Sequence, residues 1–125
     1  MHDQPSVTEM VAAVKSFIDE TAGPILEGHA AFHARVASNV LATVLRELAQ
    51  RPEAETDERE RLLGLLNSPD KDARVEDLNR ELCTRIQQGE MTSATAGLLD
   101  HLKHTTMAQV AIDQPRYSGL KTAKR

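Results

Sequence analysis

The chain has very few aromatic residues. Only Phe17, Phe32 and Tyr117 occur among its 125 residues, and tryptophan is absent. A hydrophobic core must therefore be built from leucine, valine, isoleucine and alanine. Abundant alanine and leucine, without long β-branched runs, favour helices over strands. The composition thus predicts an all-α protein.

Cysteines and long apolar runs are also scarce. The single cysteine, Cys83, excludes an intramolecular disulfide and suits a reducing compartment. The first ten residues lack the basic start and apolar centre of a signal peptide. No stretch approaches the ~18 apolar residues of a membrane span. We therefore expect a cytoplasmic protein with no membrane contact.

Motifs for phosphate binding and hydrolysis are missing. The six glycines are scattered singly, which excludes GxGxxG and Walker loops, and there is no GxSxG. The pair His29 and His33 has helical i, i+4 spacing, but Ala30 stands where HExxH requires glutamate. With no third ligand in sight, the pair predicts no metal site. We assign no catalytic residue and expect no cofactor.

The net charge of −4 is unevenly distributed. The last ten residues contribute +4, which leaves −8 on residues 1–115. This balance argues against a nucleic-acid binder, which needs a basic surface. We expect a folded domain over residues 1–117 and a basic, mobile tail over residues 118–125. Contact of that tail with nucleic acid or anionic lipid is the alternative.

Cap and stop signals divide the domain into about five helices. Ser6 and Glu9 have capping-box spacing, and Gly23-Pro24 ends the first helix. A central helix follows to about Gln50, before Arg51-Pro52. The remaining helices are expected over roughly 53–66, 75–89 and 92–113. The predicted fold is a single-domain antiparallel helical bundle.

The central helix, residues 29–48, is apolar around most of its circumference. A surface helix has a narrower apolar stripe, so we predict a largely buried second helix. The width of the apolar arc also predicts a partner surface and hence a homodimer, although a fifth helix could cover it instead. His33 lies within this arc.

His33 has two interpretations. It is either a core histidine with a hydrogen-bond partner, or it lines a small polar cavity, for instance at a subunit interface. An unsatisfied buried polar group costs about 1–3 kcal/mol, so something must satisfy its nitrogens. The core interpretation is favoured on general grounds.

Three other side chains predict no chemistry. His101 and His104 form an i, i+3 pair beside Asp100, which is typical of a solvent-exposed helix face. Cys83 lies at the edge of an apolar stripe, without a CxxC motif, and is expected to be buried and inert.

The last predicted helix ends in AIDQPRY, residues 111–117. The favoured interpretation is a helix terminus with Tyr117 folded back onto the bundle. The alternative is an interaction patch of Asp113, Arg116 and Tyr117, because arginine and tyrosine are enriched in interface hot spots.

Two motifs carry a family resemblance. FHARVASNVLATVLREL (residues 32–48) together with AIDQPRY resembles an uncharacterised bacterial family, the domain of unknown function six-two-eight-five. The likeness extends over nearly the whole chain up to Tyr117. Members of that family look like genomic neighbours of acyl-CoA dehydrogenases and aminoglycoside-phosphotransferase-like enzymes. The resemblance implies a role beside acyl-CoA metabolism and supplies no catalytic residues.

Together these observations predict a non-enzymatic accessory or interaction protein. Its expected partner is an acyl-CoA dehydrogenase or the kinase-like enzyme. The alternative is a small-molecule binding protein or enzyme that uses a cavity near His33. A DNA-binding regulator ranks third, because the last predicted helix carries only Lys103 as a basic residue in its body.

Overall fold

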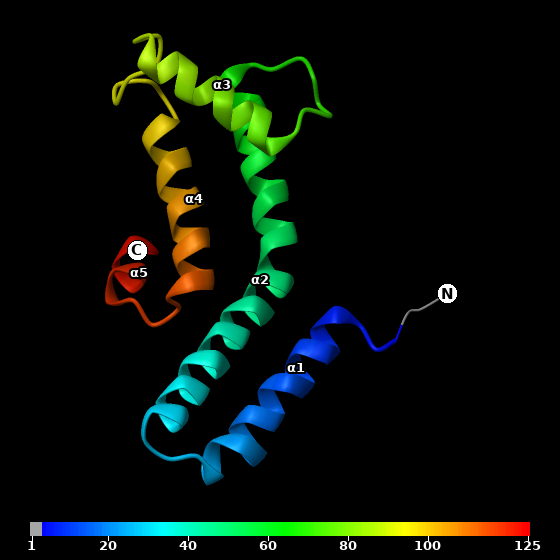
Figure 1. Cartoon of the computed structure of the whole chain (residues 1–125). Coiled ribbons are helices and arrows are strands. Elements are labelled where there is room, and N and C mark those ends of the chain that lie inside the picture. The colour runs from blue at the N-terminus through cyan, green and yellow to red at the C-terminus, as the bar shows by residue number, and fades with distance from the viewer. Residues whose placement is uncertain (1–3) are drawn as a thin grey trace. The chain divides into compact units, whose positions relative to one another are not determined.

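The computed structural model describes residues 4–125, which contain helices and no strand (Figure 1). The all-α prediction is confirmed. The chain divides into two compact units, Met1–Arg51 and Pro52–Arg125, where a single bundle was expected. Residues 1–3 of the predicted domain lie outside the described residues.

Helix α1, Val7–Phe17, begins at the predicted capping box. The backbone N–H of Ser6 donates to Glu9 Oε2 at 2.6 Å, and the backbone N–H of Glu9 donates to Ser6 Oγ at 3.2 Å. A π-helical turn, Ile18–Ala22, and a 3-10 turn, Gly23–Ile25, follow. A Cβ at Gly23 would lie 2.7 Å from the carbonyl oxygen of Ile18, so this corner needs glycine.

Helix α2, Gly28–Leu66, is a single helix of 39 residues, although the sequence predicted two. Pro52 lies inside it and was wrongly taken as a break. A proline removes one backbone hydrogen bond, and the good helix formers that follow it propagate the helix. Within this helix the hydroxyl of Thr56 donates to the carbonyl oxygen of Pro52 at 2.9 Å. No helix of the described residues is both long and apolar enough to cross a membrane.

In the first unit, α1 and residues 28–51 of α2 form a helical pair, here called the N-terminal hairpin (Figure 1). Ser38 of α2 is buried, at 8% exposure, and donates a hydrogen bond to Asp19 in the π-helical turn after α1. Among the described residues of this unit, no hydrophobic side chain is buried. The predicted largely buried second helix is therefore wrong for this part of α2, because only α1 packs against it.

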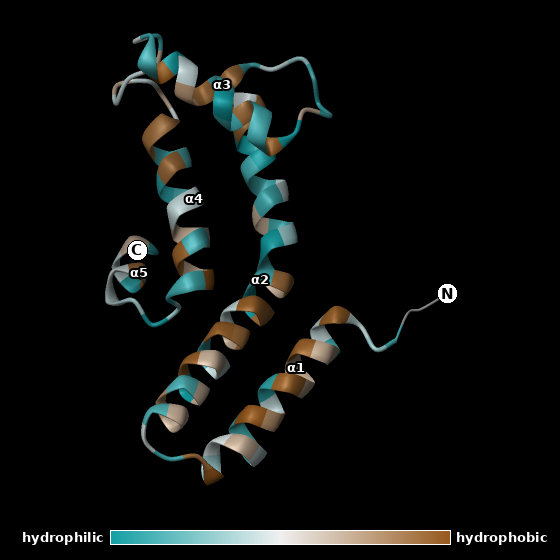
Figure 2. Cartoon of the chain, viewed as in Figure 1, coloured by the Kyte–Doolittle hydropathy of each residue, from teal (hydrophilic) through white to brown (hydrophobic). Residues whose placement is uncertain are grey.

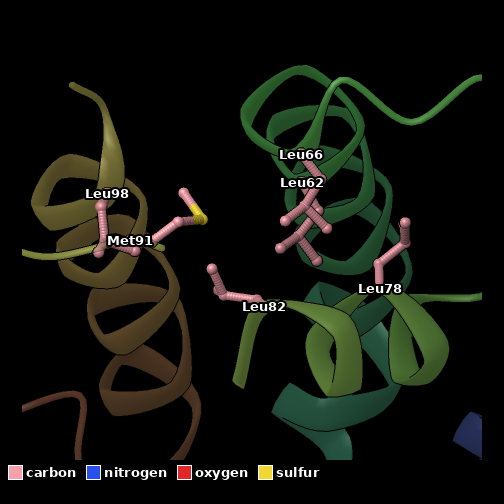
Figure 3. Close-up of a cluster of buried hydrophobic side chains, with 6 residues drawn as sticks. All are labelled: Leu62, Leu66, Leu78, Leu82, Met91 and Leu98. Atoms are coloured by element: carbon pink, nitrogen blue, oxygen red, sulfur yellow. The ribbon is translucent and has the colours of Figure 1, made fainter. Parts of the chain in front are cut away.

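The second unit contains the end of α2, helix α3 (Val75–Gln87), helix α4 (Leu98–Asp113) and helix α5 (Ser118–Ala123). Six buried hydrophobic side chains from α2, α3, the α3–α4 connection and α4 converge in one cluster, drawn in Figure 3. They are Leu62, Leu66, Leu78, Leu82, Met91 and Leu98. This aliphatic cluster agrees with the scarcity of aromatic residues.

The segment predicted as a tail includes a helix. Helix α4 ends before Gln114-Pro115, as expected, and α5 then contacts α4. Leu120 of α5 and Ile112 of α4 are both buried. Burial of Leu120 stabilises the packing of this short basic segment against α4. The mobility of residues 118–125 stays a prediction.

Candidate functional site

His33 is exposed in the chain rather than buried in an apolar arc. Its ring lies edge-on to Phe32, with ring centroids 5.6 Å apart and 70° between the planes. At about 100° per residue, His33 lies roughly 140° around α2 from Ser38, which faces α1. The single helix that packs on α2 therefore leaves His33 uncovered, and its burial was predicted wrongly for the isolated chain.

A row of apolar side chains lies beside His33 on α2. They recur at every fourth residue, are 36–56% exposed, and are here called the α2 stripe: Phe32, Val36, Val40, Val44 and Leu48. Figure 2 shows this half of α2 and much of α1 as hydrophobic ribbon. Helix α1 also exposes Val7, Met10, Val14 and Phe17. The N-terminal hairpin thus presents large apolar surfaces.

A polar junction, missed in the sequence, joins the two helices of the hairpin. Ser38 Oγ donates to Asp19 Oδ1, and Lys15 Nζ donates to Asp19 Oδ2 at 2.6 Å. Lys15 first, and then Ser38, hold the pKa of Asp19 below its ordinary value of 3.8. The i, i+4 spacing of Lys15 and Asp19 was visible in the sequence, but their contact with Ser38 depends on the corner between the helices.

Acid is expected to weaken this junction. The lowered pKa of Asp19 stabilises the folded state above the unfolded pKa of about 3.8, and that stabilisation is lost as pH falls through the folded value. Denaturant unfolding followed by circular dichroism should show Asp19→Asn less stable than wild type at neutral pH and less sensitive to acid below pH 4. Glu20→Gln, at a neighbouring exposed carboxylate, is the control. An undiminished acid loss in Asp19→Asn would contradict the assignment.

The second unit contains a cleft of about 330 Å³ between α2 and the start of α4. Its lining includes Arg61 of α2, Gly97 just before α4, and His101 on the first turns of α4. His101 is only 3% exposed, so its predicted exposure was wrong. His104 is exposed, and its Nδ1 lies 2.9 Å from the Asp100 carbonyl oxygen. The α2–α4 contact, invisible in the sequence, distinguishes the two histidines.

Two nitrogens of this cleft, here called the Arg61–His101 cleft, lack partners. His101 Nδ1 and Arg61 Nε are both buried without a hydrogen bond, while Arg61 Nη2 donates to Thr105 Oγ1 at 3.3 Å. Burial is the main cause that lowers the pKa of His101, and the nearby Arg61 charge lowers it further. Glu58 acts in the opposite direction. Burial and the Arg61 charge thus favour the neutral form of the His101 imidazole.

Two other clefts do not include His33 in their lining. One of about 190 Å³ lies in the hairpin, where Asp19, Gly23 and Arg35 are among its lining residues. Another, of about 510 Å³, is lined in the second unit by Arg59 and Arg74, among others. His33 lines none of the three clefts.

The predicted interaction patch is exposed at the end of α4. Asp113 accepts a hydrogen bond from Gln109 Nε2 at 2.7 Å, and Arg116 is exposed. Tyr117 is 56% exposed, with its ring over Gly119, where a Cβ would lie 2.5 Å from the ring. The ring thus packs on its own turn while much of it faces outward, so both interpretations of Tyr117 stay predictions.

The metal and cysteine candidates have little support. The described residues contain no group of three or more histidine, cysteine, aspartate or glutamate side chains placed to hold a metal ion. Cys83 is exposed rather than buried, because it lies on the side of α3 away from the leucine cluster.

The fold and these sites define an all-helical protein with an exposed apolar hairpin and a cleft that holds a buried histidine. The chain belongs to the family described as domain of unknown function DUF6285, whose model matches residues 24–117. The predicted family is thereby confirmed. No curated protein and no solved structure matches the chain.

Proposed function

We propose that this chain is a non-enzymatic accessory protein that works through protein–protein contacts. The observation that supports the proposal is the exposed apolar surface of the N-terminal hairpin, which has no buried hydrophobic side chain among its described residues. Two helices without an apolar core are marginal by themselves. Large exposed apolar surfaces on soluble domains mark interaction sites.

We propose that a second copy of the chain covers the exposed apolar surface of the N-terminal hairpin. Nine large hydrophobic side chains of the two hairpin helices are exposed, four on α1 and five in the α2 stripe, and covering them would bury an apolar surface on the order of the ~800 Å² that each partner buries in a standard interface. Two such hairpins provide the four helices of an ordinary bundle. Because each copy uses the same surface, the two-fold interface is closed and the assembly ends at the dimer.

The second contact is with an enzyme of acyl-CoA metabolism. The family resemblance points to an acyl-CoA dehydrogenase or an aminoglycoside-phosphotransferase-like enzyme as the partner. We place that contact on Asp113, Arg116 and Tyr117, which are exposed in the second unit, whereas the residues assigned to self-association belong to the first. Arginine and tyrosine supply the planar, hydrogen-bonding surfaces typical of hot spots.

Binding of the purified candidate enzymes to the immobilised chain tests this contact. Wild type should retain one of the two enzymes, and the double variant Arg116→Ala, Tyr117→Ala should weaken that binding by at least about tenfold, as loss of hot-spot residues does. Lys121→Ala, at another exposed residue close by, should bind as wild type. Retention of neither enzyme at low salt would overturn this part of the proposal.

A second candidate function is small-molecule binding, now in the Arg61–His101 cleft rather than near His33. The supporting observation is the buried His101, whose Nδ1 has no partner, beside the guanidinium of Arg61. The first turn of α4 has no side-chain cap, so its N-terminal end also favours a small anion. Phosphate and acetate are the probes, and a rise in melting temperature that Arg61→Gln abolishes would favour this function.

Replacing His101 should stabilise the protein. An unsatisfied buried polar group costs about 1–3 kcal/mol, so His101→Leu is expected to raise the free energy of unfolding by about 1 kcal/mol. The stability gained by His101→Leu should increase below pH 6.5. The pKa of His101 is lower in the folded than in the unfolded wild type, so the wild type loses stability as pH falls below the unfolded pKa, and the variant does not. Urea unfolding at pH 8 and pH 5.5 measures both effects. A loss of stability at both pH values would contradict them.

A further inference from the structure

The α2 stripe is symmetric about its own middle residue. It runs in steps of four from Phe32 to Leu48, with Val40 at the centre. When two copies of this helix pair antiparallel about a two-fold axis at Val40, Val36 of one copy meets Val44 of the other. Val40 meets itself, while Phe32 and Leu48, each about 80° around the helix from Val40, lie on the two flanks of the contact. Such self-complementarity is what a two-fold interface requires.

The polar residues beside the stripe follow the same symmetry. His33 and Glu47 are each seven residues from Val40, in opposite directions along the chain, and lie within about 20° of Val40 around the helix. His29 and Arg51 are each eleven residues from Val40 and lie on the same face. Antiparallel pairing therefore sets His33 of one copy opposite the carboxylate of Glu47, a donor facing an acceptor, and His29 opposite Arg51.

We infer that α2 pairs with a second α2 about Val40, and that His33 of each copy binds Glu47 of the other. This inference rests on the proposed homodimer and specifies its register. Within one chain, Glu47 Oε1 accepts from Arg51 Nε at 2.7 Å and Oε2 accepts from Arg51 Nη2 at 3.2 Å. A carboxylate offers about four lone-pair positions, so it can also accept an imidazole N–H.

The register explains why a histidine lies beside an exposed apolar stripe. A polar residue within an apolar interface is tolerated when its partner is fixed, and then it selects one register over others. Parallel pairing would set His33 against His33 and Glu47 against Glu47. The antiparallel register instead pairs donor with acceptor twice, by symmetry.

Disulfide trapping tests the register. In a Cys83→Ser background, Val40→Cys should cross-link with itself under mild oxidation. Val36→Cys should not, because about 12 Å along the axis would separate it from its own copy, beyond disulfide reach. A mixture of Val36→Cys and Val44→Cys should cross-link at least about tenfold faster than either alone. Cross-linking of Val36→Cys with itself as fast as the mixture would overturn the register.

Charge exchange tests the His33–Glu47 contact. His33→Glu should weaken the dimer by about tenfold or more, since like charges would then face each other. The double variant His33→Glu, Glu47→His should recover most of that loss by restoring the pair in the opposite sense. No weakening by His33→Glu would overturn the contact. A monomeric wild type would instead overturn the proposed homodimer, whereas a dimer with the wrong cross-links overturns the register alone.

Discussion

Val40→Glu is expected to convert the dimer to monomer. Val40 is 56% exposed in the single chain, so the substitution should leave the hairpin folded. At the two-fold axis it would place two carboxylates against each other in an apolar interface, where an unpaired buried charge costs several kcal/mol. The dissociation constant should rise by about a thousandfold, which corresponds to roughly 4 kcal/mol. Light scattering during size-exclusion chromatography measures it.

Ala49→Glu is the matched control for Val40→Glu. It adds the same charge to the same helix at an exposed position, about half a turn away from Val40 around α2. It should therefore dimerise as wild type does. If Val40→Glu is still a dimer at the protein concentration at which the wild type dimerises, the α2 stripe is not the interface.

Leu62→Ala is expected to destabilise the second unit strongly. Leu62 is fully buried in the leucine cluster of α2, α3 and α4. Truncation of a buried leucine leaves a cavity and costs about 2–5 kcal/mol. For a unit of this size, that corresponds to a fall in melting temperature of roughly 10–30 °C.

The control for Leu62→Ala is Leu99→Ala, which removes the same atoms from a residue of α4 that is 58% exposed. Its cost should stay within about 1 kcal/mol, as for most exposed positions. Thermal unfolding followed by circular dichroism compares the two variants. Equal effects would mean that the leucine cluster is not the core of this unit.

Local signals in the sequence predicted most helix ends. The Ser6–Glu9 capping box and the Gln114-Pro115 stop act through neighbouring residues, so they were visible in the sequence. Pro52 misled because a proline weakens a helix without always ending it. The burial of Leu120 gave the basic C-terminal segment a helix that composition could not suggest.

The candidate site was harder to predict, since burial depends on which helices meet. Periodicity correctly marked residues 29–48 as broadly apolar. It could not show whether another helix of the same chain or a second copy of the chain covers this surface. The same limit misplaced His33 as buried and His101 as exposed. His101 is buried because the start of α4 lies against Arg61 and Leu65 of α2, a contact 36–40 residues apart in the sequence.

The mass of the wild-type protein in solution tests the central claim most directly. Light scattering during size-exclusion chromatography at micromolar concentration should give twice the 13.8 kDa of one chain. A mass of one chain under those conditions would contradict self-association through the N-terminal hairpin, and with it the pairing of His33 with Glu47.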